Sequence, residues 1–484
     1  MENLGKIIKK LSDIEYQSFL NAVTGGKRNK PHQVLELLRE NELTDAKMME
    51  ILDVNTNAYY TLKSRLIDRI SAVMNQKPVN ALKEKVANVG HSIFDENKFI
   101  TINYLKELSK ELTEYDLSNE LIVVYKALAR LHINDPEHYT FYNRLYDKHV
   151  AYWLSVEKAE DLLYIFIREL GNYNLTRDNE DLDRIMKIRR ELFNIGELYS
   201  SHRLYVLNNI VSTYFHFSFY KNIEELKSKE GEIEIILHEF AKIFAKYELD
   251  PFYQNVKVLL DILYVQLYYC SGDLYRSIPY YKQFKERLPS ILGRHAFNFF
   301  IIQLLNSKLE KFLLDDNILD LSDMNSLMES NFEIETNEIY NLTSYKMFLA
   351  YLKYYENDFD GAIKIIEDLR EKVSYRHYNH MEIEMKLFLA VLYASIGNSE
   401  VSKQLFTSIS RHISLSGKTY TNAELLIKLL KTVLKPSGYK KNKKSIEEIY
   451  DEFLNDNNGD KQVLRYLRMN ELHFIRISSF VMKA

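Results

Sequence analysis

The residue types that most often carry catalysis or bind metals are few and scattered in this sequence. The single cysteine, Cys270, has no sequence neighbour that would activate its thiol as a nucleophile. Of the 13 histidines, only His377 and His380 form a close pair, and Glu382 and Glu384 follow them. This spacing could offer metal ligands at the start of a helix, although it falls at a break between helical segments, where polar residues are expected anyway. There is no glycine loop for phosphates, no paired Cys-x-x-Cys and no Gly-x-Ser-x-Gly. We therefore expect no catalytic residue, no metal and no cofactor.

The composition indicates an all-helical protein. The chain has 484 residues, of which 46% are hydrophobic, and it contains only 14 Gly and 7 Pro. Many short strands would need more turn residues than that. The net charge of −4 creates no field that would draw the whole chain to nucleic acid or to a membrane. No apolar leader and no run of about 18 apolar residues occurs, and a lone cysteine suits a reducing compartment. We expect a cytoplasmic protein without a membrane partner.

One stretch, residues 345–373 (YKMFLAYLKYYENDFDGAIKIIEDLREKV), predicts two helices that meet at a tight turn. Asn357 tolerates the left-handed conformation that ends a helix, and Asp358 can accept hydrogen bonds from the amides of the next helix. Small Ala350 and Ala362 would let the two helices approach closely, with Ile366 beyond them. On these residues the stretch resembles a tetratricopeptide repeat.

Residues 259–284 and 384–406 align with this stretch without gaps, with turns at Gly272 and Gly397. Asn357 lies 40 residues before Gly397, a spacing longer than the standard repeat of 34. Further breaks are predicted near residues 96–97, 134–136, 171–180, 222 and 315–316. The expected fold is an all-α solenoid of irregular tetratricopeptide-like hairpins over residues 81–434, with helices of about 12 to 22 residues and a period of about 40.

The resemblance implies a concave face lined by the first helix of each hairpin. Outward positions of these helices are rich in tyrosine, which provides contact area and a hydroxyl group for binding a peptide or a partner helix. Alternatively, these side chains pack against adjacent repeats. The candidate partner-binding residues are Gln266, Tyr269, Tyr351, Tyr354 and Tyr355.

Residues 1–80 predict a small helical domain with helices at about 14–23, 31–40, 44–52 and 57–74. Residues 45–62 (DAKMMEILDVNTNAYYTL) resemble a helix-turn-helix of bacterial DNA-binding domains, with apolar Met48, Leu52 and Tyr59 on one face. Met49 and Asp53 depart from that family, which has small residues at these places. A degenerate or protein-docking version of the fold is the alternative. The candidate DNA-binding residues are Lys27, Arg28, Lys30, Asn57, Tyr60, Thr61, Ser64 and Arg65.

The last region, residues 435–484, begins with a lysine-rich stretch, residues 435–445 (KPSGYKKNKKS), that predicts a solvated basic loop. Residues 462–482 then predict a final helix, which would cap the solenoid or form an interface.

Two functions fit this organisation. The first is a non-enzymatic scaffold or adaptor whose concave face binds a protein or a peptide. The alternative is a bacterial transcriptional regulator whose repeats sense such a partner while residues 1–80 bind double-stranded DNA. An enzyme is a distant third, and a homodimer remains open.

Overall fold

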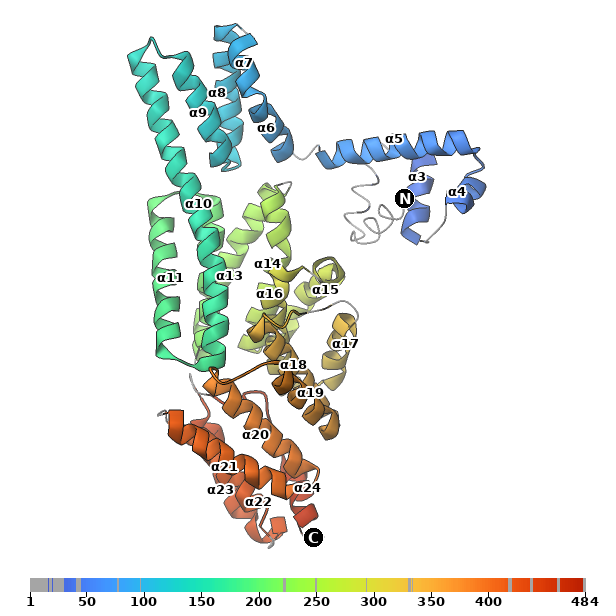
Figure 1. The fold of residues 1–484 in the computed structure, drawn as a ribbon, viewed down its shortest axis with the longest axis vertical. Helices are drawn as coiled ribbons and strands as arrows, with labels where there is room; N and C mark the ends of the chain where they lie inside the picture. The colour runs from blue at the N-terminus through green and yellow to red at the C-terminus, as the bar shows by residue number, and fades with distance from the viewer. Residues whose placement is uncertain are drawn as a thin grey trace.

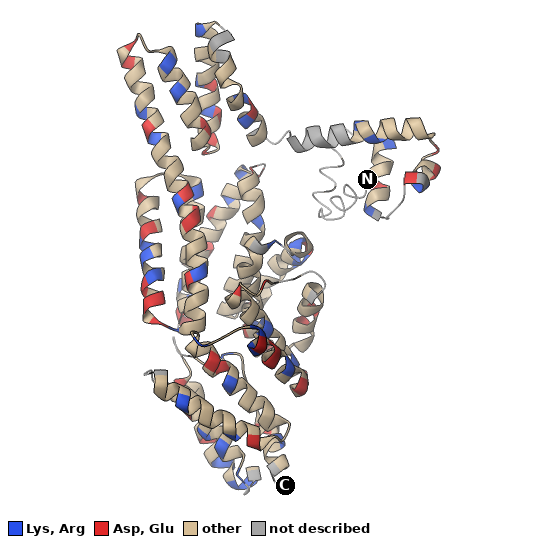
Figure 2. Ribbon diagram, in the orientation of Figure 1, with Lys and Arg blue, Asp and Glu red and all other residues tan. Residues whose placement is uncertain are grey.

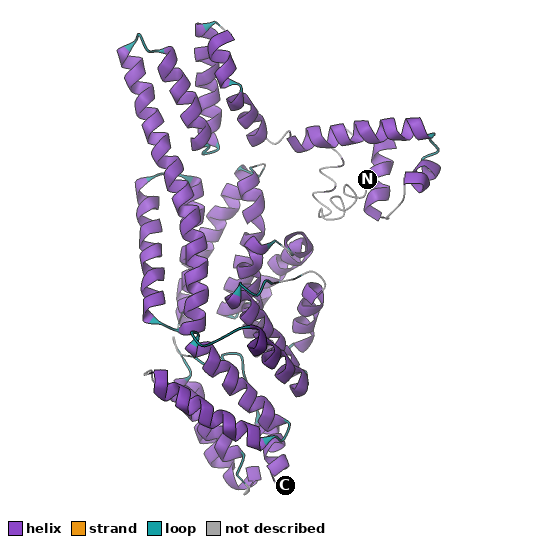
Figure 3. Ribbon diagram, viewed as in Figure 1, coloured by secondary structure: helices purple, strands orange, loops and turns teal. Residues whose placement is uncertain are grey.

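The computed structural model describes residues 16, 20, 30–40, 45–75, 78–95, 97–220, 223–248, 250–292, 294–329, 332, 334–416, 420–435, 438–458 and 462–481. Within these residues every regular element is a helix and no strand occurs, which confirms the predicted all-α class (Figure 3). Acidic and basic residues are interspersed along most helices (Figure 2), as the near-neutral composition indicates. None of the described helices is long and apolar enough to cross a membrane.

The first described helices are α3 (Lys30–Glu40), α4 (Asp45–Ile51) and α5 (Thr56–Asn75). They have a small core of their own, in which Met48, Leu52 and Tyr59 are buried as predicted. Asp53 adopts a left-handed conformation, with φ of 48°, between α4 and α5. The helix predicted at residues 14–23 lies almost wholly outside the described residues.

A second core lies between α6 (Pro78–Ala87), α7 (Val89–Asp95), α8 (Lys98–Glu114) and α9 (Ser118–Leu131). The next helix, α10 (Pro136–Thr176), has 41 residues and runs from this core into the next one (Figure 1). The prediction of helices no longer than about 22 residues is wrong here. After Pro136 the sequence of α10 contains no proline and only one glycine, Gly171, so nothing ends the helix earlier.

The third core joins the remaining helices into one hydrophobic cluster that runs from Ala159 to Ile477. Consecutive helices pack against one another. The breaks predicted near residues 171–180 and 315–316 and at the three aligned turns fall between helices, whereas the break at residues 199–201 was not predicted. These helices are α11 (Asn179–Leu198), α12 (His202–Phe219), α13 (Ile223–Lys246), α14 (Pro251–Ser271), α15 (Leu274–Ile291), α16 (Asn298–Asp315), α17 (Ile318–Glu329), α18 (Ile339–Tyr355), α19 (Phe359–Lys372), α20 (Asn379–Ser395), α21 (Ser399–Ser416), α22 (Thr421–Val433), α23 (Gly438–Asp456) and α24 (Glu471–Val481).

Three hairpins in this cluster, α14–α15, α18–α19 and α20–α21, turn in the same way. Each first helix is followed by a residue in the left-handed region, and the next residue accepts a hydrogen bond from an amide of the second helix. The left-handed residues are Gly272, Asn357 and Gly397, with φ of 79°, 63° and 87°, and the acceptors are Asp273, Asp358 and Asn398. In α18–α19, Ala350 and Ala362 are fully buried, as the predicted close packing requires. The predicted turn chemistry is confirmed.

The basic loop predicted at residues 435–445 is wrong for most of its length, because α23 begins at Gly438 and contains its last four lysines. Tyr439, Ile446, Ile449 and Phe453 form the buried face of this helix. On the exposed side, Lys443 and Lys444 lie 3.8 and 3.9 Å from glutamates one helical turn later. Apolar spacing and ion pairs of this kind outweigh the high local charge.

The final helix predicted at residues 462–482 is also wrong in its first half, because α24 begins only at Glu471. Residues 462–470, which we call the C-terminal plug, form no helix and contain a tight turn in which the Leu467 amide donates to the Leu464 carbonyl at 2.9 Å. Leu464 has a positive φ of 47°. Asn470 then starts α24 by accepting a hydrogen bond from the His473 amide at 3.1 Å.

Candidate functional site

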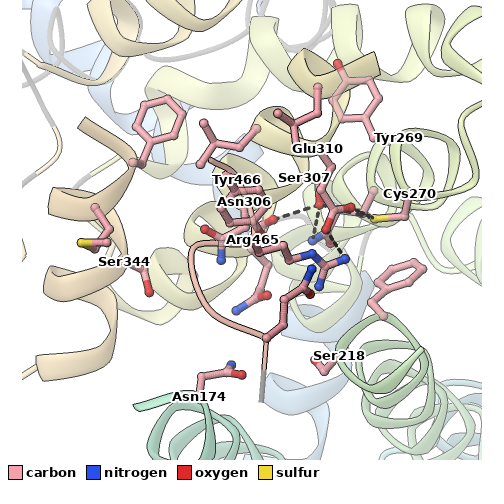
Figure 4. A pocket seen from close by; sticks show the side chains of 18 of the residues that line it. Asn174, Ser218, Tyr269, Cys270, Asn306, Ser307, Glu310, Ser344, Arg465 and Tyr466 are labelled. Carbon is pink, nitrogen blue, oxygen red and sulfur yellow. Dashed lines mark hydrogen bonds and ion pairs between the residues drawn. The ribbon is translucent and has the colours of Figure 1, made fainter. Parts of the chain in front are cut away.

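A cavity of about 740 Å³ lies among the helices of the third core and is closed on one side by the C-terminal plug (Figure 4). We call it the central cavity. Its walls come from α10, α12, α13, α14, α16, α18 and α20, and from plug residues Gln462, Arg465, Tyr466 and Arg468. Gly171 of α10 lets Tyr340 of α18 pack directly on the helix backbone, since a Cβ atom there would lie 3.1 Å from the Tyr340 side chain. These walls are therefore built from segments far apart in the sequence.

Two neighbouring tyrosines of α18 bind the backbone of the plug. The Tyr355 hydroxyl donates to the carbonyl of Tyr466 at 2.5 Å and accepts a hydrogen bond from the amide of Arg468 at 3.1 Å. The Tyr354 hydroxyl donates to the carbonyl of Arg468 at 3.2 Å. Such bonds satisfy backbone groups that no secondary structure pairs.

The two ends of the plug are held by other side chains. The Asn457 amide group binds both the amide and the carbonyl of Val463, each at 2.8 Å. At the other end, the Met469 amide donates to the Tyr450 hydroxyl at 3.0 Å. The apolar side chains of Val463, Leu464, Leu467 and Met469 are all buried.

Glu310 of α16 is the charged centre of the cavity wall. Its carboxylate lies 2.5 Å from the Arg465 guanidinium and accepts hydrogen bonds from the Tyr220 hydroxyl and the Cys270 thiol, both at 3.0 Å (Figure 4). Arg465 also donates to the Tyr220 hydroxyl. Burial, together with the nearby Glu310 charge, raises the pKa of Cys270 well above its usual range. The thiol is therefore a hydrogen-bond donor and is unsuited to act as a nucleophile.

Glu384 of α20 contacts the start of the plug, because its carboxylate accepts a hydrogen bond from the Leu464 amide at 3.0 Å. Burial raises the pKa of Glu384 to about 7, while the Arg177 charge and the Leu464 amide oppose this shift. His380 lies 3.7 Å from Glu384. Within the described residues, no group of three or more His, Cys, Asp or Glu side chains could hold a metal ion.

The rest of the lining mixes uncharged polar side chains with apolar ones. Asn174 and Gln303 both donate to the Tyr340 hydroxyl, at 3.3 and 2.7 Å. Two buried polar atoms on the lining, Gln266 Oε1 and Tyr351 Oη, have no hydrogen-bond partner. The charged lining residues are three arginines and three glutamates, so their formal charges cancel. A cavity with this lining suits an uncharged or charge-balanced polar ligand, such as a segment of polypeptide.

All five residues predicted to bind a partner lie at this site. Gln266, Tyr269 and Tyr351 line the central cavity, and Tyr354 and Tyr355 lie against the plug. Four of them are buried and Tyr355 is half-buried. The plug contacts three of them, Tyr351, Tyr354 and Tyr355. The alternative of packing within the core also holds for Tyr351, whose ring stacks on Phe388 with centroids 4.6 Å apart. Their role in partner binding stays a prediction.

Glu310, Arg465 and Tyr466 were not predicted from the sequence. In the sequence, Glu310 has the pattern of an ordinary polar position on a helix. Arg465 and Tyr466 lie between Leu464 and Leu467, and the spacing of these two leucines is typical of a helix. The only sequence signal of an irregular segment near Arg465 is the run of turn residues at 456–460 (DNNGD).

The candidate DNA-binding residues of α5 share one exposed side. Asn57, Tyr60, Thr61, Ser64 and Arg65 are all exposed. Lys30 is exposed as well, and its ammonium donates to the Leu52 carbonyl at 3.3 Å. Lys27 and Arg28 lie outside the described residues.

Comparisons of the chain with protein-family models, with curated proteins and with solved structures found no match. Its site is therefore interpreted from its own geometry.

Proposed function

We propose that this chain is a non-enzymatic scaffold or adaptor that binds a peptide or a segment of a partner protein in the central cavity. In this proposal the hairpins from α6 to α22 stack as an irregular tetratricopeptide-like solenoid, and the cavity is the deepest part of its concave face. The proposed setting is the bacterial cytoplasm.

The observation that carries the proposal is that the cavity is bordered by a segment of polypeptide that the helices bind through its backbone. Tyr354, Tyr355 and Glu384 bind backbone groups of the plug, which every peptide possesses. Tyrosine suits this task, since its rigid ring adds contact area and its hydroxyl can donate and accept. The remaining volume of about 740 Å³ lies within the range typical of ligand pockets, about 300–1,000 Å³.

The proposal can be tested by selecting peptides from a random-sequence display library on the full-length chain. Binding of the selected peptides is then measured on the wild type, on Asn306→Ala and on Arg411→Ala. Asn306 lines the cavity, whereas Arg411 is exposed on α21, away from it. We expect Asn306→Ala to weaken binding by about tenfold, as loss of an amide that binds the peptide backbone would. Arg411→Ala is the control and should bind like the wild type. Selection of no peptide, or equal binding by both variants, would refute the proposal.

A second candidate, a regulator that also binds DNA, is favoured by α5. Five predicted contact residues at and beyond its first turn share an exposed side, and Asp53 forms a tight left-handed turn between α4 and α5. A helix presented in this way could enter the major groove, with Arg65 near phosphates.

A mobility-shift titration of the full-length chain with random duplex DNA tests this second candidate. We expect binding at about 50 mM salt that weakens steeply as salt increases. Arg65→Ala should reduce that salt dependence, and Lys47→Ala, exposed on α4, is the control. Absence of binding at about 50 mM salt would exclude the regulator.

A further inference from the structure

The part of the plug that faces the cavity is a tight turn. The Leu467 amide donates to the Leu464 carbonyl at 2.9 Å, so Arg465 and Tyr466 occupy the two central positions of the turn. Both side chains line the central cavity. Figure 4 shows Arg465 pointing toward Glu310, and the Tyr466 ring packs edge-on against Tyr351 with centroids 5.8 Å apart. The plug thus presents an arginine followed by an aromatic residue.

The helices recognise this pair by two kinds of contact. Glu310 is specific for a cation, because its carboxylate and the Tyr220 hydroxyl bind the Arg465 guanidinium together. Tyr355 and Glu384 are not specific for a side chain, because they bind only the carbonyl and the amides of the plug. This division is typical of sites that bind peptides, in which main-chain bonds provide affinity and one side-chain pocket provides specificity.

The plug differs from an ordinary capping segment in how its backbone is paired. Its only internal backbone bond closes the turn. Side chains supply the others, from Asn457, Tyr450 and His473 nearby in the sequence and from Glu384, Tyr354 and Tyr355 of distant helices. A segment held in this way can leave without breaking a helix, and the helices would keep the same donors and acceptors for another chain.

Building on the proposed function, we propose that the plug is a built-in ligand of the central cavity. A partner then binds by replacing it with a turn of its own, in which an arginine meets Glu310 and the next, aromatic residue takes the place of Tyr466. The ligand class is a basic–aromatic segment of polypeptide, and the plug keeps the site closed to weaker binders.

Because the plug is tethered, it competes at an effective concentration on the order of millimolar. A free peptide of the same sequence should therefore bind the wild type only near that concentration. Arg465→Ala removes the contact with Glu310 and leaves this carboxylate available to the arginine of a peptide. The affinity of the peptide should then rise by about tenfold or more, as expected for a charge-assisted hydrogen bond.

The test uses a labelled synthetic peptide with the sequence of residues 462–470 and a control peptide whose first arginine is replaced by glutamate. Fluorescence anisotropy gives their affinities for the full-length wild type, Arg465→Ala, Arg411→Ala and Glu310→Gln. We expect the arginine peptide to prefer Arg465→Ala over the wild type, and Arg411→Ala to behave like the wild type. On Glu310→Gln the two peptides should bind alike.

A second measurement does not depend on any variant. Hydrogen exchange of the Leu464, Arg468 and Met469 amides is followed in the wild type with and without about 1 mM peptide. Displacement of the plug predicts faster exchange of all three. Unchanged exchange overturns the inference, and so does equal binding of the two peptides to Arg465→Ala. If library-selected peptides bind while these amides stay protected, the plug is a fixed wall of the cavity, and the proposed function survives without this inference.

Discussion

The turn between α18 and α19 and the turn within the plug share one feature and differ in what holds them. Each contains a residue other than glycine with positive φ, Asn357 in the first and Leu464 in the second. At the first turn, the Asp358 amide donates to the Lys353 carbonyl, and the Asp358 carboxylate accepts a hydrogen bond from the Gly361 amide. Both partners of Asp358 therefore lie within five residues of it in the sequence. At the second, the amide of Leu464 binds Glu384, 80 residues away.

This difference shows that the plug conformation is imposed by the rest of the fold. Asparagine enters the left-handed region readily, whereas leucine does so at a cost of roughly 1–2 kcal/mol. Burial of Leu464 and its neighbours and the bonds from distant helices must offset that cost. Removing a distant contact should therefore affect the plug more than a change at Asn357 affects its hairpin.

The largest effect is expected for Asn457→Ala. The variant leaves both the amide and the carbonyl of Val463 buried without a partner, at a cost of about 3 kcal/mol in unfolding free energy. Urea unfolding followed by circular dichroism measures it. The control is Asn458→Ala. Asn458 is exposed, and its side-chain amide donates a hydrogen bond to the nearby Asn455 carbonyl. Equal stability of the two variants would show that the plug contributes little to the third core.

The next effect depends on pH and on Glu384. The pKa of Glu384 is about 7 in the folded chain against an ordinary value of 4.5, so the folded state binds more protons between these values. Stability is then highest at the acidic end of this window and falls as pH rises, by about 2 kcal/mol from pH 5 to pH 7 for this group. Glu384→Gln should remove this part of the slope. Asp261, whose pKa is raised to about 6, changes in the same direction and stays in the variant. The difference between the two urea-unfolding profiles isolates Glu384, and parallel profiles would contradict the assignment.

A matched pair of hydroxyl deletions separates plug contacts from core packing. Tyr355→Phe removes bonds to the Tyr466 carbonyl and the Arg468 amide and should cost about 1–2 kcal/mol. Tyr351→Phe removes a buried hydroxyl without a partner and should be neutral or slightly stabilising. Thermal unfolding of the two variants checks this order. If Tyr351→Phe were the more destabilised variant, the hydrogen bonds of Tyr355 would not stabilise the plug.

The smallest effect is expected at the local turn. Asn357→Gly should leave stability nearly unchanged, since glycine accepts the left-handed conformation, whereas Asn357→Ala should cost about 1 kcal/mol. Differential scanning calorimetry can resolve the two. If Asn357→Ala lowered the unfolding free energy as much as Asn457→Ala, the two turns would not differ in how strongly stability depends on them.

The same contrast explains what could be predicted from the sequence. The turns at Gly272, Asn357 and Gly397, with Ala350 and Ala362 beside one of them, depend on neighbours in the sequence and were predicted. The tyrosines of α14 and α18 were placed together because they share a face of their helices.

The plug could not be predicted for the opposite reason. Leu464 and Leu467 have the spacing of a helix, and only Glu310, Glu384 and Tyr355, from three other helices, decide that the segment forms a turn. The length of α10 was also missed, because breaks were expected at regular intervals, whereas its sequence contains none between Pro136 and Gly171. The lysines of α23 were assigned to a loop because their charge masked the apolar face behind them.

The most direct test of the central claim, that the cavity binds polypeptide in competition with the plug, is the affinity of one library-selected peptide for two full-length proteins. Isothermal titration calorimetry would compare the wild type with Arg465→Ala. The account predicts tighter binding to Arg465→Ala, by about tenfold or more, because the variant weakens the competing plug. Equal or weaker binding to Arg465→Ala would contradict it.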